Sequence, residues 1–141
     1  MIYSQASEYA FRALIELAGH RDGPIPAARL AEAAQIPQYF LAKILQQLAR
    51  QGMLRSYRGP RGGFTLARGP EEISLLGVVD ALEGITRYKR CAVGLAECSD
   101  EMPCPMHESW KGLRNQVLAY LEDRTVADLA EALKRKQELL T

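Results

Sequence analysis

Long apolar runs are missing from this sequence, and so is an even set of cysteines. No stretch approaches the roughly 18 consecutive apolar residues of a transmembrane helix, and the start lacks the basic-then-apolar pattern of a secretory signal. We therefore expect a soluble, cytoplasmic protein with no membrane partner. Three cysteines cannot all pair with one another, which argues against a disulfide scaffold. Metal or redox chemistry is the better interpretation of these cysteines.

Internal repeats and low-complexity segments are also missing, so the 141 residues predict one domain, or a small domain with an appended arm. The net charge of +1 hides an asymmetry. Residues 1–70 carry nine basic and four acidic side chains, whereas residues 71–141 carry nine basic and thirteen acidic ones. The two net charges are +5 and −4, which suggests that the first half meets a polyanion.

Apolar residues recur at helical spacing through the first half of the chain. A helix is predicted over residues 7–20, with Ser7 as its N-cap. A short helix over residues 27–34 follows and then, after a break, a longer helix from Pro37 that ends at Gly52. Short helix, tight turn and longer helix form the helix-turn-helix pattern. The apolar face of the longer helix is predicted to contain Phe40, Leu41, Ile44, Leu45 and Leu48.

The stretch "MLRSYRGPRGGFTLAR" predicts a hairpin directly after the recognition helix, which is a wing. Its strands are expected over residues 53–57 and 64–67. Arginine suits phosphates and narrow minor grooves, so a wing rich in arginine is expected to bind DNA. No acidic residue lies between positions 50 and 68, which hold five arginines: Arg50, Arg55, Arg58, Arg61 and Arg68.

The second half predicts a short helix from Ser74 to Gly84, a helix over residues 108–124, and a final helix capped by Thr125. The helix over 108–124 carries an apolar stripe, which could pack on the winged domain or on its copy in a dimer. We favour the dimer, because two-fold symmetric DNA sites are read by dimers. The expected fold is mainly α with a two-stranded wing, divided into a winged helix-turn-helix domain (1–84), a cysteine-rich loop (85–107), and a dimerisation helix with a C-terminal helix (108–141).

The loop "CAVGLAECSDEMPCPMH" contains all three cysteines, Cys91, Cys98 and Cys104, and ends on His107. Zinc knuckles and ribbons usually contain a CxxC or CxxxxC pair, and this loop has neither. Wider spacing suits an iron–sulfur cluster, which holds its thiolate ligands further apart than a single ion does. An iron–sulfur cluster is therefore favoured, with His107 as a candidate fourth ligand. A zinc site and a metal-free thiol switch remain alternatives.

Four stretches together resemble the Rrf2 family of winged-helix regulators over nearly the whole chain: "SEYAFRAL", "LAEAAQIPQYFLAKILQQLARQGML", "RGPRGGFTLAR", and three cysteines followed by "PMHESW". The resemblance implies a homodimer in which the long helix after the cysteine loop crosses its twin. It also implies a [2Fe–2S] or [4Fe–4S] cluster that controls affinity for double-stranded promoter DNA, with Cys91, Cys98 and Cys104 as ligands.

The fourth ligand divides this family. Some members use a His three residues after the last Cys, which matches His107, whereas others use a carboxylate in the first helix of the partner subunit, where Glu8 stands. We favour His107, because a ligand in the same short loop requires no particular dimer geometry. The resemblance also places Tyr39, Phe40, Ala42 and Lys43 toward the bases, although Phe40 competes for the apolar face.

These patterns predict a dimeric transcription regulator that is not an enzyme. Its promoter affinity would be controlled by an iron–sulfur cluster that senses nitric oxide, redox state or cluster supply. Arg50, Arg58 and Arg61 are expected to join Tyr39, Phe40 and Lys43 in binding DNA. The alternative is a winged-helix regulator without a cluster, switched by a thiol–disulfide change or stabilised by zinc.

Overall fold

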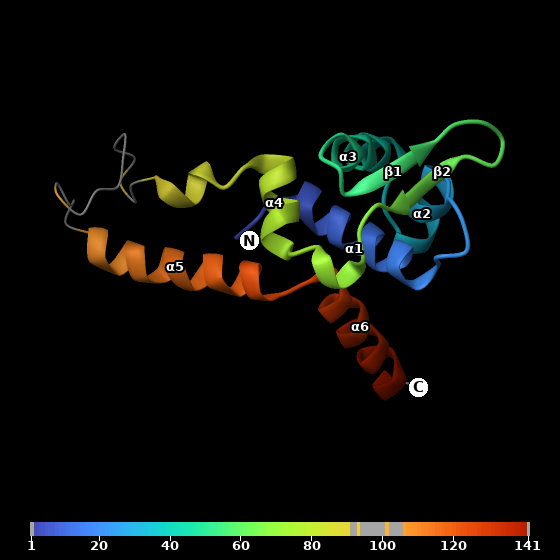
Figure 1. Cartoon of the computed structure of the whole chain (residues 1–141). Helices are drawn as coiled ribbons and strands as arrows, with labels where there is room; N and C mark the ends of the chain where they lie inside the picture. The colour runs from blue at the N-terminus through green and yellow to red at the C-terminus, as the bar shows by residue number, and fades with distance from the viewer. Residues whose placement is uncertain (1, 91–92, 94–100, 102–105, 141) are drawn as a thin grey trace.

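Helix α1 runs through the middle of the fold and contacts most of the other elements (Figure 1). The structure is a computed structural model and describes residues 2–90, 93, 101 and 106–140. This part of the chain is mainly helical with one two-stranded antiparallel sheet, which confirms the predicted fold class. The elements are α1 (Gln5–Gly19), α2 (Ala27–Ala34), α3 (Gln38–Arg50), β1 (Leu54–Tyr57), β2 (Gly63–Leu66), η1 (Pro70–Glu72), α4 (Leu75–Glu83), η2 (Thr86–Lys89), α5 (His107–Asp123) and α6 (Val126–Leu140).

Apolar positions of α1 are buried at the spacing that the sequence predicts, and they form the centre of the core: Ala10, Phe11, Ala13, Leu14 and Leu17. The predicted N-cap is wrong. Ser4 caps the helix by accepting from the amide of Ser7, so α1 begins two positions before Ser7. Ser7 instead lies inside the helix, where its buried hydroxyl donates to Glu83 at 2.7 Å.

Helices α2 and α3 form the predicted helix-turn-helix. The turn between them passes through Gln35, which adopts the left-handed conformation (φ 56°) that usually favours glycine. Arg12 from α1 donates to the carbonyls of Ala34 and Gln35 at 2.7 and 2.8 Å. The charged side chain therefore satisfies the carbonyl groups that the end of α2 leaves without helical partners.

Strands β1 and β2 form the wing, and each agrees with its predicted range to within one residue. Leu54 lies opposite Leu66, and Tyr57 lies opposite Gly63. The base of the wing is joined to the segment before α2 by two backbone hydrogen bonds between Ile25 and Phe64, at 3.0 and 2.9 Å. A Cβ atom on Gly63 would lie 2.4 Å from the carbonyl of Ile25, so only glycine permits this approach.

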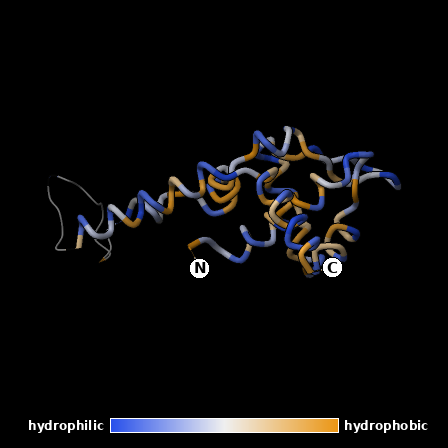
Figure 2. The backbone as a smooth tube through the Cα atoms, turned by 90° about the horizontal axis from the view of Figure 1, so that it is seen from below, coloured by the Kyte–Doolittle hydropathy of each residue, from blue (hydrophilic) through white to orange (hydrophobic). Residues whose placement is uncertain are grey.

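Helix α5 extends from the winged domain as an arm beside the segment that contains η2 (Figure 1). In Figure 2 the arm alternates between hydrophilic and hydrophobic residues, as an amphipathic helix does. The junction between α5 and α6 is joined to the start of α4: the Leu75 amide donates to the Arg124 carbonyl, and the Val126 amide donates to the Ile73 carbonyl. Helix α6 then packs on α1 and η1, after a reciprocal cap between Thr125 and Asp128.

No helix in the described part of the chain is long and apolar enough to cross a lipid bilayer.

Candidate nucleic-acid interface and cysteine-loop site

Helix α3 presents one continuous exposed stripe to solvent. Tyr39, Lys43, Gln46 and Arg50 are exposed and follow one another at intervals of four, three and four residues, which places them on one face of a helix. The opposite face is buried in the core through Leu41, Ile44, Leu45 and Leu48. The packing therefore fixes the helix from behind and leaves its polar face open, as a helix that enters a major groove requires.

Three side chains form a contact at the start of this stripe. The Lys43 ammonium donates to the Tyr39 hydroxyl at 2.9 Å and lies 4.4 Å from the centre of its ring. This hydrogen bond, and then the positive charge of Lys43, lowers the pKa of Tyr39. Phe40 meets the Tyr39 ring edge-on, with 5.2 Å between ring centres.

Phe40 corrects part of the sequence prediction. Its side chain is 53% exposed, so it does not belong to the apolar face of α3 that packs in the core. The buried residues of α3 are Leu41, Ile44, Leu45 and Leu48, and the Phe40 ring is left half-exposed beside Tyr39. A large exposed aromatic beside Tyr39 is instead available to a partner.

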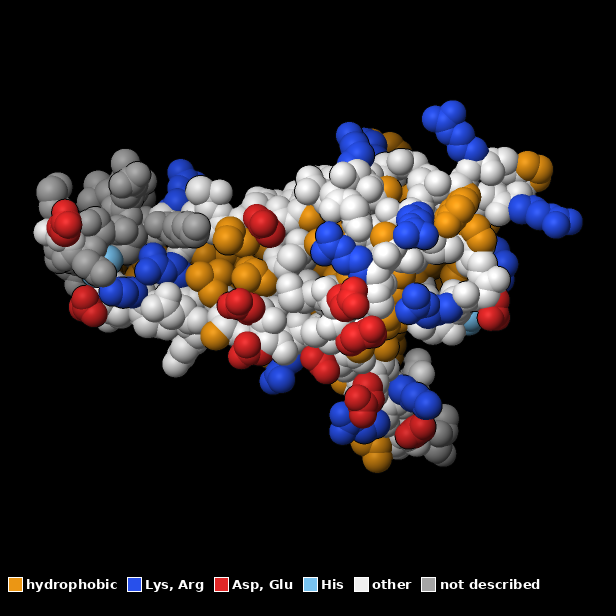
Figure 3. Space-filling model, viewed as in Figure 1, with side chains coloured by type: hydrophobic (Ala, Val, Ile, Leu, Met, Phe, Trp, Pro, Cys, Tyr) orange, Lys and Arg blue, Asp and Glu red, His pale blue; other side chains and the backbone are white. Residues whose placement is uncertain are grey.

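The wing adds a second exposed basic surface beside α3. Arg55, Arg58 and Arg61 are exposed along β1 and at the tip (Figure 3, where Lys and Arg side chains project from the wing). A shallow hollow separates the wing from α3 and is lined by Gln46, Ser56, Tyr57, Arg58 and Phe64 among others. Helix α3 and the wing therefore border one hollow, and Arg58 is its basic lining residue.

Sequence reasoning missed two members of this surface. Gln46 continues the stripe that begins at Tyr39, a position that the helical spacing of seven residues could have indicated. Tyr57 is 45% exposed at the end of β1 and lines the same hollow. No motif marks Tyr57, because its exposure depends on how the wing folds against α3.

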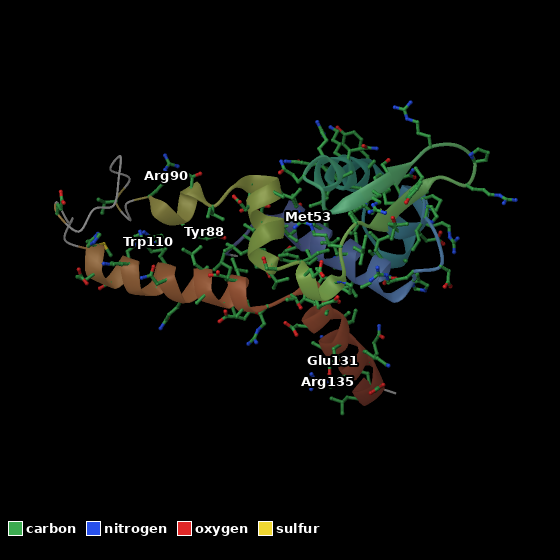
Figure 4. All side chains as sticks on the ribbon, viewed as in Figure 1. Met53, Tyr88, Arg90, Trp110, Glu131 and Arg135 are labelled. Carbon is green, nitrogen blue, oxygen red and sulfur yellow. The ribbon has the colours of Figure 1, made fainter. Side chains whose placement is uncertain are left out.

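The cysteine loop lies largely outside the described residues, and this includes Cys91, Cys98 and Cys104. Its two ends are described. The indole N–H of Trp110 on α5 donates to the carbonyl of Arg90 at 2.7 Å. Figure 4 labels Tyr88, Arg90 and Trp110 at this end of the arm, where η2 and α5 lie side by side. The residue before Cys91 is therefore held against the first turn of α5.

His107 is the first residue of α5 and lies in that same turn. Its side chain is only 2% exposed, which is uncommon for histidine and places it inside the arm. The hydrogen bond from Trp110 thus holds Arg90, the residue before Cys91, next to the turn that contains His107. Three thiols and an imidazole within 17 residues of sequence are a donor set that fits an iron–sulfur cluster.

Glu8, the other candidate for a fourth ligand, lies on a different helix from His107. It is in the first turn of α1, where its charge acts on Tyr3. Burial raises the pKa of Tyr3, and the charges of Tyr120 and Glu8 add to this effect. Tyr120 lies about 20 Å along α5 from His107 at the helical rise of 1.5 Å per residue. Among the described residues, no group of three or more His, Cys, Asp or Glu side chains is placed to hold a metal ion.

Comparison with known proteins agrees with this architecture. The Rrf2 family, described as "Iron-dependent Transcriptional regulator", matches residues 3–132. A protein of Aquifex aeolicus strain VF5, predicted to be an HTH-type transcriptional regulator, is 34% identical over 131 residues, covering 92% of this chain and 91% of its own. The HTH-type transcriptional regulator IscR of Yersinia pseudotuberculosis is 29% identical and covers 92% of this chain and 79% of its own.

Among solved structures, the oxidized form of Staphylococcus aureus CymR superposes with a TM-score of 0.73. It is 28% identical, and the match covers 93% of this chain and 97% of CymR. The relatives are transcriptional regulators and not enzymes, which confirms the prediction that this chain is not an enzyme. The match over residues 3–132, together with the winged helix-turn-helix, identifies the chain as a member of the Rrf2 family of transcriptional regulators.

Proposed function

We propose that this chain is a dimeric cytoplasmic regulator whose affinity for promoter DNA is controlled by an iron–sulfur cluster in its cysteine loop. The observation that carries the proposal is the contact between the two described ends of the cysteine loop. Trp110 joins the residue before Cys91 to the turn that contains buried His107, and four soft or borderline donors belong to the short segment between them. The family description as iron-dependent supports the same conclusion.

DNA recognition is assigned to two surfaces with different chemistry. Tyr39, Phe40 and Lys43 at the start of α3 would meet base edges, because a recognition helix enters the major groove with its N-terminal residues. Arg50 at the end of α3, with Arg58 and Arg61 at the tip of the wing, would contact phosphates or the adjacent minor groove. The first group would provide specificity, and the second most of the affinity.

The ligands that we propose are Cys91, Cys98, Cys104 and His107. A [2Fe–2S] or [4Fe–4S] cluster bound there would supply a centre that reacts with nitric oxide, oxygen and electron donors. His107 is only 2% exposed, so its imidazole is kept away from bulk water. Glu8 of the partner subunit is the alternative fourth ligand, and it requires a dimer that brings the first turn of α1 to the partner's loop.

The arm supports the proposed dimer. Leu113 and Tyr120 on α5 are 54% and 49% exposed, and their spacing of seven residues places them on one face of the helix. Figure 3 shows hydrophobic side chains grouped on the surface of the arm, next to acidic ones. A second copy that covers this face would hold two recognition helices for half-sites roughly 34 Å apart. We therefore keep the division into a winged domain (1–84), a cluster loop (85–107) and a dimerisation region (108–141) as part of the proposal.

A cluster-free thiol switch is the second candidate, and one comparison favours it. Staphylococcus aureus CymR, which shares the fold over 93% of this chain, is known as an oxidized form. Two of the three cysteines of the present chain could form a disulfide on oxidation and leave the third free. A zinc ion on the same four ligands would stabilise the loop without sensing.

Purification without oxygen, followed by absorption spectroscopy and assays for iron and acid-labile sulfide, tests the proposal. A brown protein with sulfide, whose colour is lost in Cys91→Ala, Cys98→Ala and Cys104→Ala, is expected. A colourless protein that resists cluster reconstitution would contradict it. In that case, stoichiometric zinc would favour the zinc site, and a mass lower by two hydrogen atoms after mild oxidation would favour the thiol switch.

A further inference from the structure

One side chain joins the recognition helix to the end of α4 that leads into the cysteine loop. The Nε2 group of Gln47 on α3 donates to the carbonyls of Ala81 and Leu82, at 3.1 and 3.4 Å. Carbonyls in the last turn of a helix have no partner within the helix. Helix α4 ends at Glu83, and the next residue, Gly84, adopts a positive φ of 75°. Gln47 therefore caps α4 from a neighbouring element.

The same turn of α4 is attached to the start of α1. The Glu83 carboxylate accepts hydrogen bonds from the amide and hydroxyl of Ser4, at 2.9 and 2.5 Å, and from the Ser7 hydroxyl at 2.7 Å. The Tyr88 hydroxyl donates to the carbonyl of Ile2. Residues 81–88 are thus held by the recognition helix on one side and by the N-terminal segment on the other.

This turn is also close to the cysteine loop along the chain. Only η2 separates it from Arg90, whose carbonyl accepts from Trp110 on α5. A shift of Arg90 relative to α5 would therefore reach the end of α4 through one short helical segment. Packed elements of this kind move as units and do not deform gradually, so a small shift at one end is transmitted.

We infer that Gln47 is a positioning residue, which sets the placement of the recognition helix against α4 according to the state of the cysteine loop. It differs from the residues proposed to touch DNA. Tyr39, Lys43, Gln46 and Arg50 share the exposed stripe, whereas Gln47 lies one residue further round and its amide faces α4. The inference rests on the proposed function, because it concerns how the state of the loop reaches the DNA-binding surface.

Two substitutions and a matched control test this role. Gln47→Met keeps an unbranched side chain of similar length and removes the donor, whereas Gln47→Glu directs a carboxylate at two carbonyl acceptors. Gln51→Met makes the same change at the exposed C-cap of α3. The probe is a duplex selected from a random library with the wild-type protein. Its Kd is measured for the full chain purified without oxygen, and again after iron is removed by chelation.

The measured quantity is the ratio of these two Kd values. We expect a wild-type ratio on the order of tenfold, a Gln51→Met ratio equal to it, and ratios within about twofold of one for both Gln47 variants. Hydrogen exchange provides a readout independent of DNA. Exchange in residues 38–51 should differ between the two states of the wild type and be the same in the two states of Gln47→Met.

A purely structural role for Gln47 would weaken DNA binding equally in both states and leave the ratio unchanged. That result, in either Gln47 variant that folds, would overturn the inference and leave the proposed function intact. A wild-type ratio of one would overturn both, since no coupling would exist for Gln47 to transmit.

Discussion

Tyr39 and Lys43 act as a unit at the residue scale, because the ammonium group both donates to the phenol and lies over its ring. The hydrogen bond and the positive charge favour the phenolate, which lowers the pKa of Tyr39. Lys43→Met removes both effects, so the pKa of Tyr39 should rise. Titration of the tyrosine ring carbons by NMR, with Tyr39→Phe to identify the signal, measures this change.

The lowered pKa of Tyr39 has a consequence for DNA binding. As the pH rises through the pKa of Tyr39, a negative charge forms at the surface that would face DNA. The wild-type affinity should therefore fall toward alkaline pH, starting below the usual tyrosine range. A Tyr39 pKa that does not respond to Lys43→Met would contradict the pairing.

Phe40 and Leu41 are neighbours with different expected roles, DNA binding for Phe40 and core stability for Leu41. Phe40 is 53% exposed, and Leu41 is fully buried. Phe40→Ala should change the free energy of unfolding by less than about 0.5 kcal/mol and weaken DNA binding about tenfold, because an exposed ring contributes little to the core. Leu41→Ala should cost about 2–5 kcal/mol of unfolding free energy.

Chemical denaturation and fluorescence anisotropy with a selected duplex measure these two quantities. If Phe40→Ala unfolded as readily as Leu41→Ala, the ring would belong to the core after all. If Phe40→Ala bound DNA like the wild type, the ring would not contact DNA.

At the scale of elements, the wing carries positive charge on side chains that take no part in the core. Arg58 and Arg61 are exposed at its tip, where each would release about one counterion on meeting a phosphate. Arg58→Ala and Arg61→Ala should each weaken binding to all duplexes and reduce the slope of log K against log salt concentration by about one.

Arg135→Ala is the matched control for the wing. Arg135 is exposed on α6, where it faces Glu131 at 3.6 Å. Its loss should alter neither the affinity nor the salt slope. Equal slopes for the wild type and both wing variants would remove the wing from the DNA interface.

The positions of the helices and strands were the part of the fold that could be predicted best from the sequence. Helical periodicity placed α2 and α3 correctly, and Ser74 caps α4 and Thr125 caps α6 as expected. The error at Ser7 involves a partner distant in sequence, whereas the error at Phe40 reflects a ring that stays exposed at the start of α3. Ser7 is not an N-cap because Glu83, 76 residues away, binds its hydroxyl.

Residues of the candidate site could be predicted from sequence where local charge or spacing indicates them. Residues whose role depends on tertiary packing could not. The arginine-rich wing and the cysteine spacing could be read from the sequence. Gln47 could not, because nothing in its local pattern distinguishes it from Gln46. Only the approach of α4 to α3 gives Gln47 two carbonyl partners.

Across the whole molecule, the described residues leave apolar side chains of the arm exposed. Leu113 is 54% exposed in the middle of α5, so Leu113→Asp should preserve the fold and destabilise the proposed dimer by placing charge at its centre. Sedimentation should then show a monomer with weakened DNA binding. Leu139→Asp, on the exposed end of α6, should remain dimeric. A dimeric Leu113→Asp would move the interface away from this face.

Control of DNA affinity by the state of the cysteine loop is the core of the proposed mechanism. Its most direct test is the Kd of the wild-type chain for one selected duplex, measured with protein purified without oxygen and again after cluster removal. We expect Kd values that differ on the order of tenfold, and a Cys104→Ala variant whose Kd does not respond to the same treatment. Equal Kd values in the two wild-type states would contradict it.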